Sequence, residues 1–406
     1  MRHRTTKALA PLMTILLALG SLGCKPDTVQ IGAVVPLTGQ YQSYGEANKR
    51  GIELAYEEIR SDGYPLDLEL TVADSGSDPA KARQLLEEQY ANGAFVVIGG
   101  SVSDEAEEMV AGADRYDRVL LSPSATSPDL TKASRNFFRI APSDQTEGSK
   151  MADFAFRVLE LETVAVIAES GTYAQGIQQA FSSAYETLGG EILELIELPP
   201  NTSDLTGLID RVVTLKPDAV YLAAYESGSA AMILELKRLG FAGRILTTHA
   251  FSSPGAIARV GPAAEGVVLT QTVFDPDSEH AHVKKFVDAY REHYGEEPNL
   301  FAAEGYDAMK VLSVALEERH TIASELPRGL WDAVKEFPGV TGSIQFDENG
   351  DVRKFPRVYV IGKNQALYDY SKRIEENEKK LREKQEELKR RLQEIRNSAA
   401  RIGNGG

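Results

Sequence analysis

Residues 31–55 constrain the fold more than any other stretch of this sequence. They begin with an apolar run that ends at Pro36 and Gly39, and from about Tyr44 the apolar residues recur at helical spacing. This order predicts a strand, a turn and a helix. Such a turn places the free backbone N–H groups of the helix start at the carboxyl edge of a sheet, where small anions bind readily.

The same alternation of apolar strands and amphipathic helices continues along the chain. We expect strands at residues 66–73, 95–98, 119–121, 163–167, 219–223, 245–248 and 267–270, and helices at 79–91, 103–116 and 173–188. This alternation predicts an α/β fold with parallel, doubly wound sheets. A chain of 406 residues is too long for one ordinary domain, so we expect two such lobes.

The composition excludes some classes of protein. A hydrophobic content of 42% is enough for a full core and argues against disorder. The formal net charge of -16 argues against a nucleic-acid partner, because phosphate binding needs a basic surface. Cys24 is the only cysteine, so no disulfide can form within the chain.

The N-terminal residues follow the basic, apolar and small-residue order of a secretory signal peptide. Basic residues precede an apolar run at residues 8–19, which is shorter than the about 20 residues that span a membrane. We predict a signal peptide over residues 1–23 and a linker over residues 24–28. The Ser-Leu-Gly before Cys24 resembles the lipobox of bacterial lipoproteins, which implies a lipid anchor that is the chain's sole membrane contact. Because the leucine lies one position closer to the cysteine than that motif prefers, ordinary leader cleavage beside a chance cysteine is the alternative.

The amino-acid sequence of the first segment also resembles that of a known protein family. PLTG closes the first predicted strand and Tyr44 precedes Gly45, which resembles the branched-chain amino-acid binding proteins, type I periplasmic binding proteins that serve ABC importers. Later motifs recur in the family's order, so the resemblance covers about residues 29–368. It implies a small ligand, an amino acid above all, in a cleft between the lobes. It also implies an ABC permease as partner, no cofactor, and a place in the periplasm or on the outer face of the cell membrane.

The resemblance also divides the chain. Residues 140–143 have no periodicity, and we interpret them as a first crossover between lobes. The stretch from FDPD onward resembles the family's return to the first lobe, and a third crossing is expected at residues 340–342, before a strand pair. The predicted ranges are 29–140 and 275–340 for the first lobe, 141–274 and 341–369 for the second, 272–276 for the return, and 344–346 and 358–361 for the pair. Three crossovers form a hinge, which lets a cleft close.

Two loops match the family's carboxylate-binding loops. The stretches GGSVS and SPSAT carry the resemblance, which assigns carboxylate binding to Ser103, Ser124 and Thr126. From the residues alone, Ser103 could be only an N-cap, and Thr126 or Ser127 could only start the next helix. These roles are compatible with binding, because the first-turn amides are where an anion docks.

Aromatic residues are expected to form the wall of the cleft. Tyr173 and Tyr225 follow predicted strands and match aromatic positions of the family's pocket, as does Tyr44. Tyr44 and, more weakly, Phe301 are expected to form the wall. Strand carboxyl ends are where a doubly wound sheet presents ligand groups. Ordinary packing at the edge of a core is the alternative for each of them.

The partner of a ligand ammonium is the point where this sequence departs from the family. His249 stands where the relatives carry an acidic residue, and neutral imidazole offers a weaker partner than a carboxylate. Glu226, beside Tyr225, is a substitute, although it could equally be a solvated carboxylate at a helix start. Two ligand classes therefore stay open, an amino acid held by Glu226, which is slightly preferred, and a carboxylate or amide without an ammonium.

No catalytic or metal-binding constellation is recognised in the sequence. The single cysteine lies at the anchor, G-x-S-x-G is absent, and His280 and His282 are two residues apart without a third ligand at metal spacing. We therefore expect a binding protein and not an enzyme.

The C-terminal segment is different in kind and lies outside the resemblance. Isoleucine or leucine recurs every seven residues from 374 to 402, but the second core position of each heptad is polar in the first heptads. We predict a long charged helix over residues 370–402, either single or in a coiled coil that self-associates. This segment keeps open an alternative function, an interaction or sensor lipoprotein of the cell envelope that uses the same fold.

Overall fold

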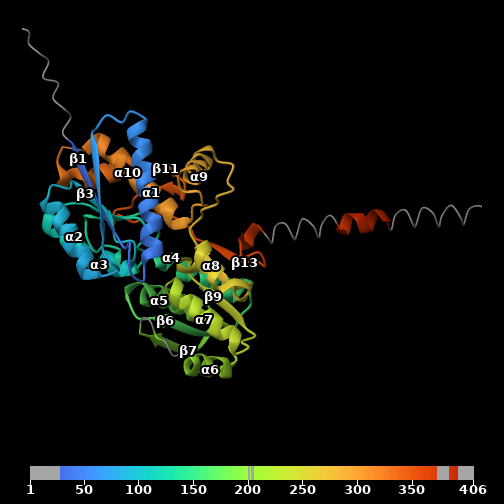
Figure 1. The fold of residues 1–406 in the computed structure, drawn as a ribbon. Coiled ribbons are helices and arrows are strands. Elements are labelled where there is room, and N and C mark those ends of the chain that lie inside the picture. The colour runs from blue at the N-terminus through green and yellow to red at the C-terminus, as the bar shows by residue number, and fades with distance from the viewer. Residues whose placement is uncertain (1–27, 200–201, 203–204, 320, 373–383, 392–406) are drawn as a thin grey trace, which may run out of the picture.

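A computed structural model describes residues 28–199, 202, 205–319, 321–372 and 384–391. Two sheets, each with its own helices, form two lobes (Figure 1). The strand order is β2-β1-β3-β4-β5 in the five-stranded sheet, which we call lobe 1, and β14-β13-β10-β9-β8-β6-β7 in the seven-stranded sheet, which we call lobe 2. The predicted fold class, two doubly wound lobes, is confirmed.

Lobe 1 contains the first strands of the chain and helices from both of its parts. Its strands are β1 (Val29–Val35), β2 (Leu68–Asp74), β3 (Val96–Gly99), β4 (Leu120–Ser122) and β5 (Phe137–Arg139), and all neighbouring pairs are parallel. Its helices are α1 (Gln42–Ser61), α2 (Pro79–Ala91), α3 (Ser103–Tyr116), α9 (Ala281–Tyr294), α10 (Leu300–Arg319) and α11 (Leu326–Ala333).

Lobe 2 is built in the same way. Its strands are β6 (Thr163–Glu169), β7 (Glu191–Leu198), β8 (Ala219–Ala223), β9 (Arg244–Thr247), β10 (Val268–Gln271), β13 (Arg357–Ile361) and β14 (Leu367–Asp369). Strand β13 pairs antiparallel with β10 and with β14, and the other neighbouring pairs are parallel. Its helices are α4 (Asp144–Asp153), α5 (Thr172–Thr187), α6 (Thr206–Leu215), α7 (Glu226–Arg238) and α8 (Pro254–Val260).

Both sheets are buried on both faces, which explains their continuous apolar strands. In β6, Val164 and Val166 pack on the same side as Ile177 of α5, whereas Ala165 and Ile167 pack with the apolar side chains of α6, α7 and α8. In lobe 1, α2 and α3 cover one face of the sheet and α1 and α10 cover the other. This layering leaves the two ends of each sheet as the places where polar side chains can gather.

The third crossing between lobes lies later in the chain than the sequence predicts. Residues after β12 (Gly342–Ile344) stay against lobe 1, where the Phe346 ring lies 5.2 Å from the Phe138 ring and Arg139 N donates to Gly350 O at 3.1 Å. The physical reason is the fully buried Arg139 guanidinium, whose Nε lies 2.7 Å from Asp351 Oδ1. The crossing therefore follows Asp351, and not residues 340–342.

Strands lie near both segments predicted as a strand pair, 344–346 and 358–361, but the two strands do not pair with each other. β12 pairs with β11 (Phe337–Gly339), and β13 pairs with β10 and β14 in lobe 2. The two segments thus belong to different sheets.

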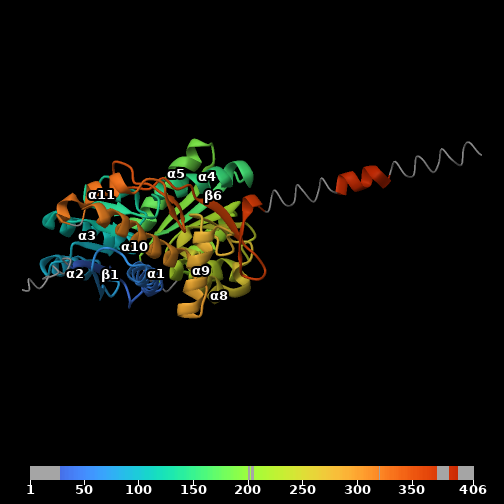
Figure 2. The ribbon, with the colours of Figure 1, turned by 90° about the horizontal axis from the view of Figure 1, so that it is seen from above.

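Several predicted features fall wholly or largely outside the described residues. These are the signal peptide, Cys24, and most of the C-terminal helix and its heptad positions. Residues 384–391 are helical and lie well apart from both lobes (Figure 2), and Leu388 is 59% exposed there. Among the described residues, no helix has the length and apolar character needed to cross a membrane.

Helices α1 and α10 pack at very close range. This contact holds Tyr44 of α1 and Phe301 of α10 in place beside lobe 2. Asn48 Nδ2 donates to Phe301 O at 2.7 Å. A Cβ atom on Gly51 would lie 1.9 Å from Ala302 O, and one on Gly305 would lie 2.3 Å from Asn48 O. Glycine is therefore required at this crossing, because any side chain would push the helix backbones apart.

We predict that Gly305→Ala lowers the free energy of unfolding by about 1 to 3 kcal/mol, the usual cost of overpacking. Denaturant unfolding of the purified protein measures this change. Gly255→Ala is the matched control, because Gly255 is also helical and no atom lies within 4 Å of the added Cβ. Equal stability of the two variants would contradict the close helix contact.

Candidate functional site

The predicted ligand-binding residues lie where the carboxyl ends of the two sheets meet. Lobe 1 contributes the segments that follow β1, β3 and β4, together with the start of α10, and lobe 2 contributes those that follow β6, β8 and β9. All nine are buried except Tyr225, which is partly buried. They are Tyr44, Ser103, Ser124, Thr126, Tyr173, Tyr225, Glu226, His249 and Phe301.

Ser103 ties the two carboxylate-binding loops of lobe 1 together. Its Oγ accepts hydrogen bonds from Thr126 N at 3.2 Å and Ser127 N at 3.1 Å, so its own O–H points to a further acceptor. The N-cap of α3 is Val102, and not Ser103. Ser127 does cap the next short helix, by accepting from Asp129 N at 3.3 Å. Ser103 thus joins the loops and keeps a donor for an anion.

Ser124 and Thr126 lie on the second of these loops. Ser124 Oγ lies 2.8 Å from Ser101 O and 3.0 Å from Asn48 Oδ1. Thr126 Oγ1 donates to Asp144 Oδ2 of lobe 2 at 2.8 Å. The threonine hydroxyl is therefore a contact between lobes in this structure.

Five aromatic rings line the space between the lobes. The centroid distances are 5.8 Å for Tyr44 and Tyr225, 4.8 Å for Tyr44 and Phe301, 4.7 Å for Tyr173 and Tyr225, and 5.6 Å for Tyr173 and His249. Rings at these distances attract one another weakly and bury large apolar areas. The structure thus brings together the aromatic residues that the sequence predicts for the wall of the cleft.

The lobes are closed onto each other in this structure. Tyr44 OH accepts from Glu226 N at 2.8 Å and donates to Ala250 O at 2.9 Å. Asp104 accepts across the cleft from Tyr225 OH at 3.1 Å and from Thr172 N at 3.0 Å. Contacts of this kind exist only in the closed arrangement, so they contribute to the free energy of closure.

The Glu226 carboxylate is bound by residues of lobe 2. It accepts from Ser253 Oγ at 3.0 Å and pairs with the Arg259 guanidinium, which both lie at α8. Its side chain is 5% exposed, so it is not a solvated carboxylate either. Its negative charge is thus already matched within lobe 2.

His249 instead forms a buried pair with Glu147 of α4, a residue that sequence reasoning missed. His249 N donates to Glu147 Oε1 at 3.0 Å, and His249 Nδ1 lies 2.8 Å from Glu147 Oε2. Thr270 Oγ1 also donates to Glu147 Oε1, at 3.0 Å. Burial by itself lowers the pKa of His249, but the Glu147 and Asp144 carboxylates outweigh it and raise the pKa to about 9.

Two further buried carboxyl groups surround this pair. Asp144 lies one helical turn before Glu147, and Glu304 lies on α10, three residues after Phe301. Burial raises the pKa of Asp144, and burial raises the pKa of Glu304 to about 8. Asp144 and Glu147 are three residues apart and so share a face of α4, which is the only relation among these acids that the sequence itself contains.

Asp144, Glu147 and His249 bring their ligand atoms within 4.8 Å of one another. Two carboxylates and one imidazole form a donor set that a divalent cation accepts. In this structure Glu147 bonds to two atoms of His249 and accepts a hydrogen bond from Thr270 Oγ1.

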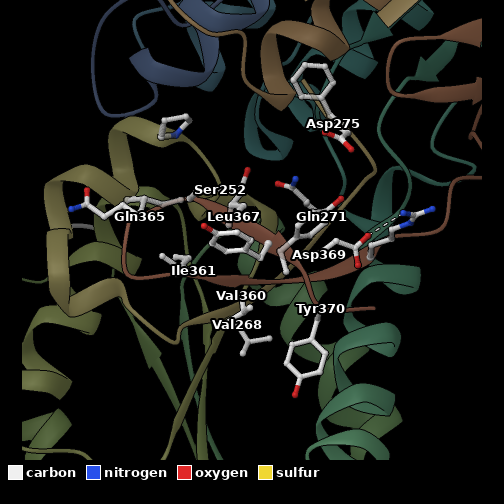
Figure 3. Close-up of a pocket in the computed structure, with 18 of the residues that line it drawn as sticks. Ser252, Val268, Gln271, Asp275, Val360, Ile361, Gln365, Leu367, Asp369 and Tyr370 are labelled. Atoms are coloured by element: carbon white, nitrogen blue, oxygen red, sulfur yellow. Dashed lines mark hydrogen bonds and ion pairs between the residues drawn. The ribbon is translucent and has the colours of Figure 1, made fainter. Parts of the chain in front are cut away.

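Two cavities lie outside the aromatic cluster. One, of about 1550 Å³, lies at the β13–β14 edge of lobe 2, where Figure 3 shows Val360, Ile361 and Leu367 on its strands. None of the nine predicted residues lines it. The other, of about 230 Å³, lies between Tyr41 of lobe 1 and Glu169 of lobe 2 and touches Tyr225. We therefore place the candidate site at the meeting sheet edges, where the polar groups converge, and not in either of these two cavities.

Known proteins resemble this chain over most of its length. The sequence profile of the family described as "Periplasmic binding protein" matches residues 28–360. A leucine-, isoleucine-, valine-, threonine- and alanine-binding protein of Pseudomonas aeruginosa is 24% identical over 359 residues, 86% of this chain and 94% of that protein.

Solved structures agree with this match. A leucine binding protein from Thermotoga maritima has a TM-score of 0.79 and 27% identity, and it covers 84% of this chain and 97% of its own. A branched-chain amino acid transporter substrate binding protein from Streptococcus pneumoniae, in complex with isoleucine, has a TM-score of 0.77 and 25% identity, with the same two coverages.

The buried groups around His249 predict that stability falls as the pH rises. His249 titrates near pH 9 when folded and near 6.5 when unfolded, so its stabilisation is complete below pH 6.5 and is lost as the pH rises through 9. Glu304 acts in the same sense, because its folded pKa of about 8 exceeds the unfolded value. The His249 shift alone lowers the free energy of unfolding by about 2 to 3 kcal/mol between pH 6 and pH 9, and Glu304 adds to this fall up to about pH 8.

Urea unfolding at a series of pH values tests this expectation. His249→Asn removes the titrating ring, and its stability should therefore depend less on pH over this range. Stability of the unmodified protein that rises toward pH 9 would show that the histidine is neutral in the folded state.

Proposed function

The chain belongs to the periplasmic binding protein family, and we propose that it captures a small ligand, an amino acid or a related carboxylate or amide, in the cleft between its lobes and delivers it to an ABC-type importer. The observation that carries this proposal is the convergence of hydroxyl groups, backbone N–H groups and aromatic rings at the facing sheet edges. The amino acids named for the Pseudomonas aeruginosa and Streptococcus pneumoniae proteins support the ligand class.

In this proposal, the ligand carboxylate binds in lobe 1. Ser103 offers its O–H, and the hydroxyls of Ser124 and Thr126 exchange their present bonds to Ser101 O and Asp144 Oδ2 for bonds to the ligand. Tyr44, Tyr173, Tyr225 and Phe301 surround the rest of the ligand. Closure adds the contacts from lobe 2, and the closed form is what a membrane permease recognises. No bond is made or broken, so the protein is not an enzyme.

The leader suggests how the protein is placed in the cell. We propose that residues 1–23 are removed and that Cys24 carries the lipid that anchors the protein in the periplasm or on the outer face of the cell membrane. The charged C-terminal segment is proposed to form a helix that self-associates as a coiled coil. Its heptad spacing supports this, as does the exposed Leu388.

We predict that leucine, isoleucine or valine raises the melting temperature of the purified protein, and that Ser103→Ala weakens the binding of that ligand. Loss of a hydrogen bond to a charged group costs about 1.5 to 3 kcal/mol, which is a loss of roughly tenfold or more in affinity. Isothermal titration calorimetry measures it.

Thr187→Ala is the control, because Thr187 Oγ1 bonds only within α5, to Ser183 O at 2.7 Å, and is exposed. Its affinity should match that of the unmodified protein. If no amino acid, amide or small carboxylate shifts the melting temperature, the proposed function is wrong.

A further inference from the structure

We propose that Asp104 is the latch between the two lobes, because its carboxylate holds the start of α5 and the Tyr225 hydroxyl of lobe 2 against lobe 1. The latch sets how long a bound ligand stays in the cleft. Asp104 is thus a positioning residue that acts on closure and does not contact the ligand. This inference rests on the proposed function, since it concerns the release of the ligand that the proposed function places in the cleft.

The first observation is that one carboxylate of lobe 1 receives two donors of lobe 2. Asp104 lies in the first turn of α3, its Oδ1 accepts from Thr172 N at 3.0 Å, and its Oδ2 accepts from Tyr225 OH at 3.1 Å. Hydrogen bonds to an ionised group are roughly twice as strong as bonds between neutral groups. Each oxygen of this carboxylate therefore contributes to the contact between the lobes.

The second observation is that α5 has no side-chain cap within lobe 2. Its N-cap residue is Gly171, which has no side chain that could accept a hydrogen bond. The first N–H groups of a helix find no acceptor inside the helix itself. Asp104 supplies the acceptor for the N–H of Thr172, the first residue of α5, from the other lobe. This cap exists only while the lobes are closed.

The third observation is that two helix starts meet at this carboxylate. Helix α3 begins at Ser103 of lobe 1, one residue before Asp104, and α5 begins at Thr172 of lobe 2. The N-terminus of each helix carries a partial positive charge, so the two ends repel each other. A carboxylate bonded between them turns this repulsion into an attraction. Loss of its charge therefore weakens closure more than loss of a neutral hydrogen bond would.

The backbone of lobe 2 allows this close approach only because residue 171 is a glycine. Gly171 has a φ of +130°, which residues with a side chain rarely adopt. A Cβ atom added there would lie 2.8 Å from Asp104 Oδ1. Any side chain at this position would thus be strained and would also push the carboxylate away from the start of α5.

Direct contact with the ligand is the competing assignment for Asp104. Both of its oxygens are already held by lobe 2, so a ligand could reach them only by breaking a contact between the lobes. The side chain instead acts on the proposed ligand wall from behind. It holds the hydroxyl of Tyr225, and it holds the residue next to Tyr173. Both rings are therefore kept in place by a group that only closure brings to them.

The test measures how fast L-leucine leaves the cleft. The purified full chain is loaded with radiolabelled L-leucine, an excess of unlabelled leucine is added, and the label that stays bound is followed over time. We expect Asp104→Asn, which keeps the shape of the side chain but removes its charge, to speed release about tenfold. Release of isoleucine and of valine should be faster by the same factor, because the latch does not touch the ligand.

Glu108→Gln is the matched control. Glu108 lies on the same helix, but it pairs with Arg83 of the same lobe at 2.8 Å. This variant should release leucine at the rate of the unmodified protein. Gly171→Ala is a second test variant, from the opposite lobe, and it should also speed release, because its Cβ displaces the Asp104 carboxylate.

Hydrogen exchange provides a measurement that needs no ligand. Asp104 protects the N–H of Thr172, which has no acceptor within its own helix. Deuterium uptake of residues 171–174, followed by mass spectrometry, should therefore be faster in Asp104→Asn than in the unmodified protein and in Glu108→Gln.

Two results would overturn the inference while the proposed function stands. One is release from Asp104→Asn at the same rate as from Glu108→Gln. The other is a change in release that differs between leucine and valine, which would make Asp104 a ligand contact. If no amino acid binds, the proposed function fails and hydrogen exchange alone decides whether Asp104 holds the lobes together. Equal uptake in the two variants would then contradict the latch, and faster uptake in Asp104→Asn would support it.

Discussion

Parallel strands bring all of their carboxyl ends to one edge of a sheet, and the two sheets of this protein turn those edges toward each other. Every polar group of the candidate site depends on this arrangement. Loops that follow six different strands meet there, although the residues they carry are spread from Tyr44 to His249. The layered helices bury both faces of each sheet, so the edges are the places left for recognition.

Charge inside the closed cleft is arranged in two separate groups. Glu226 is neutralised by Arg259 at the α8 side, where it also helps hold Tyr44 through its backbone N–H. Glu147 is paired with His249, and the carboxyls of Asp144 and Glu304 lie beside that pair. Burying a charge without a partner is costly, so Glu226 depends on Arg259 and Glu147 on His249, whereas burial raises the pKa values of Asp144 and Glu304.

Local patterns in the sequence predicted the elements well. The helices at 79–91 and 103–116 and the strand at 219–223 have the predicted bounds, because apolar spacing and turn residues decide them locally. The third crossing was predicted too early, because it depends on the pairing of Arg139 with Asp351 across 212 residues. The ion pair between Glu226 and Arg259 forms only in the folded chain, and no periodicity in the sequence indicated that these two residues would lie side by side.

The candidate site shows the same division between local and distant causes. The loops after β3 and β4 could be recognised from short motifs, since each is a continuous stretch of chain. Asp144, Glu147 and Glu304 could not, because α4 and α10 bring them together from opposite lobes. When β9 is considered alone, His249 at its end suggests that the expected acidic residue is missing from this place in the cleft. Its bond to Glu147 brings a carboxylate to the same place from a residue 102 positions away, and the protonated imidazole balances the charge of that carboxylate.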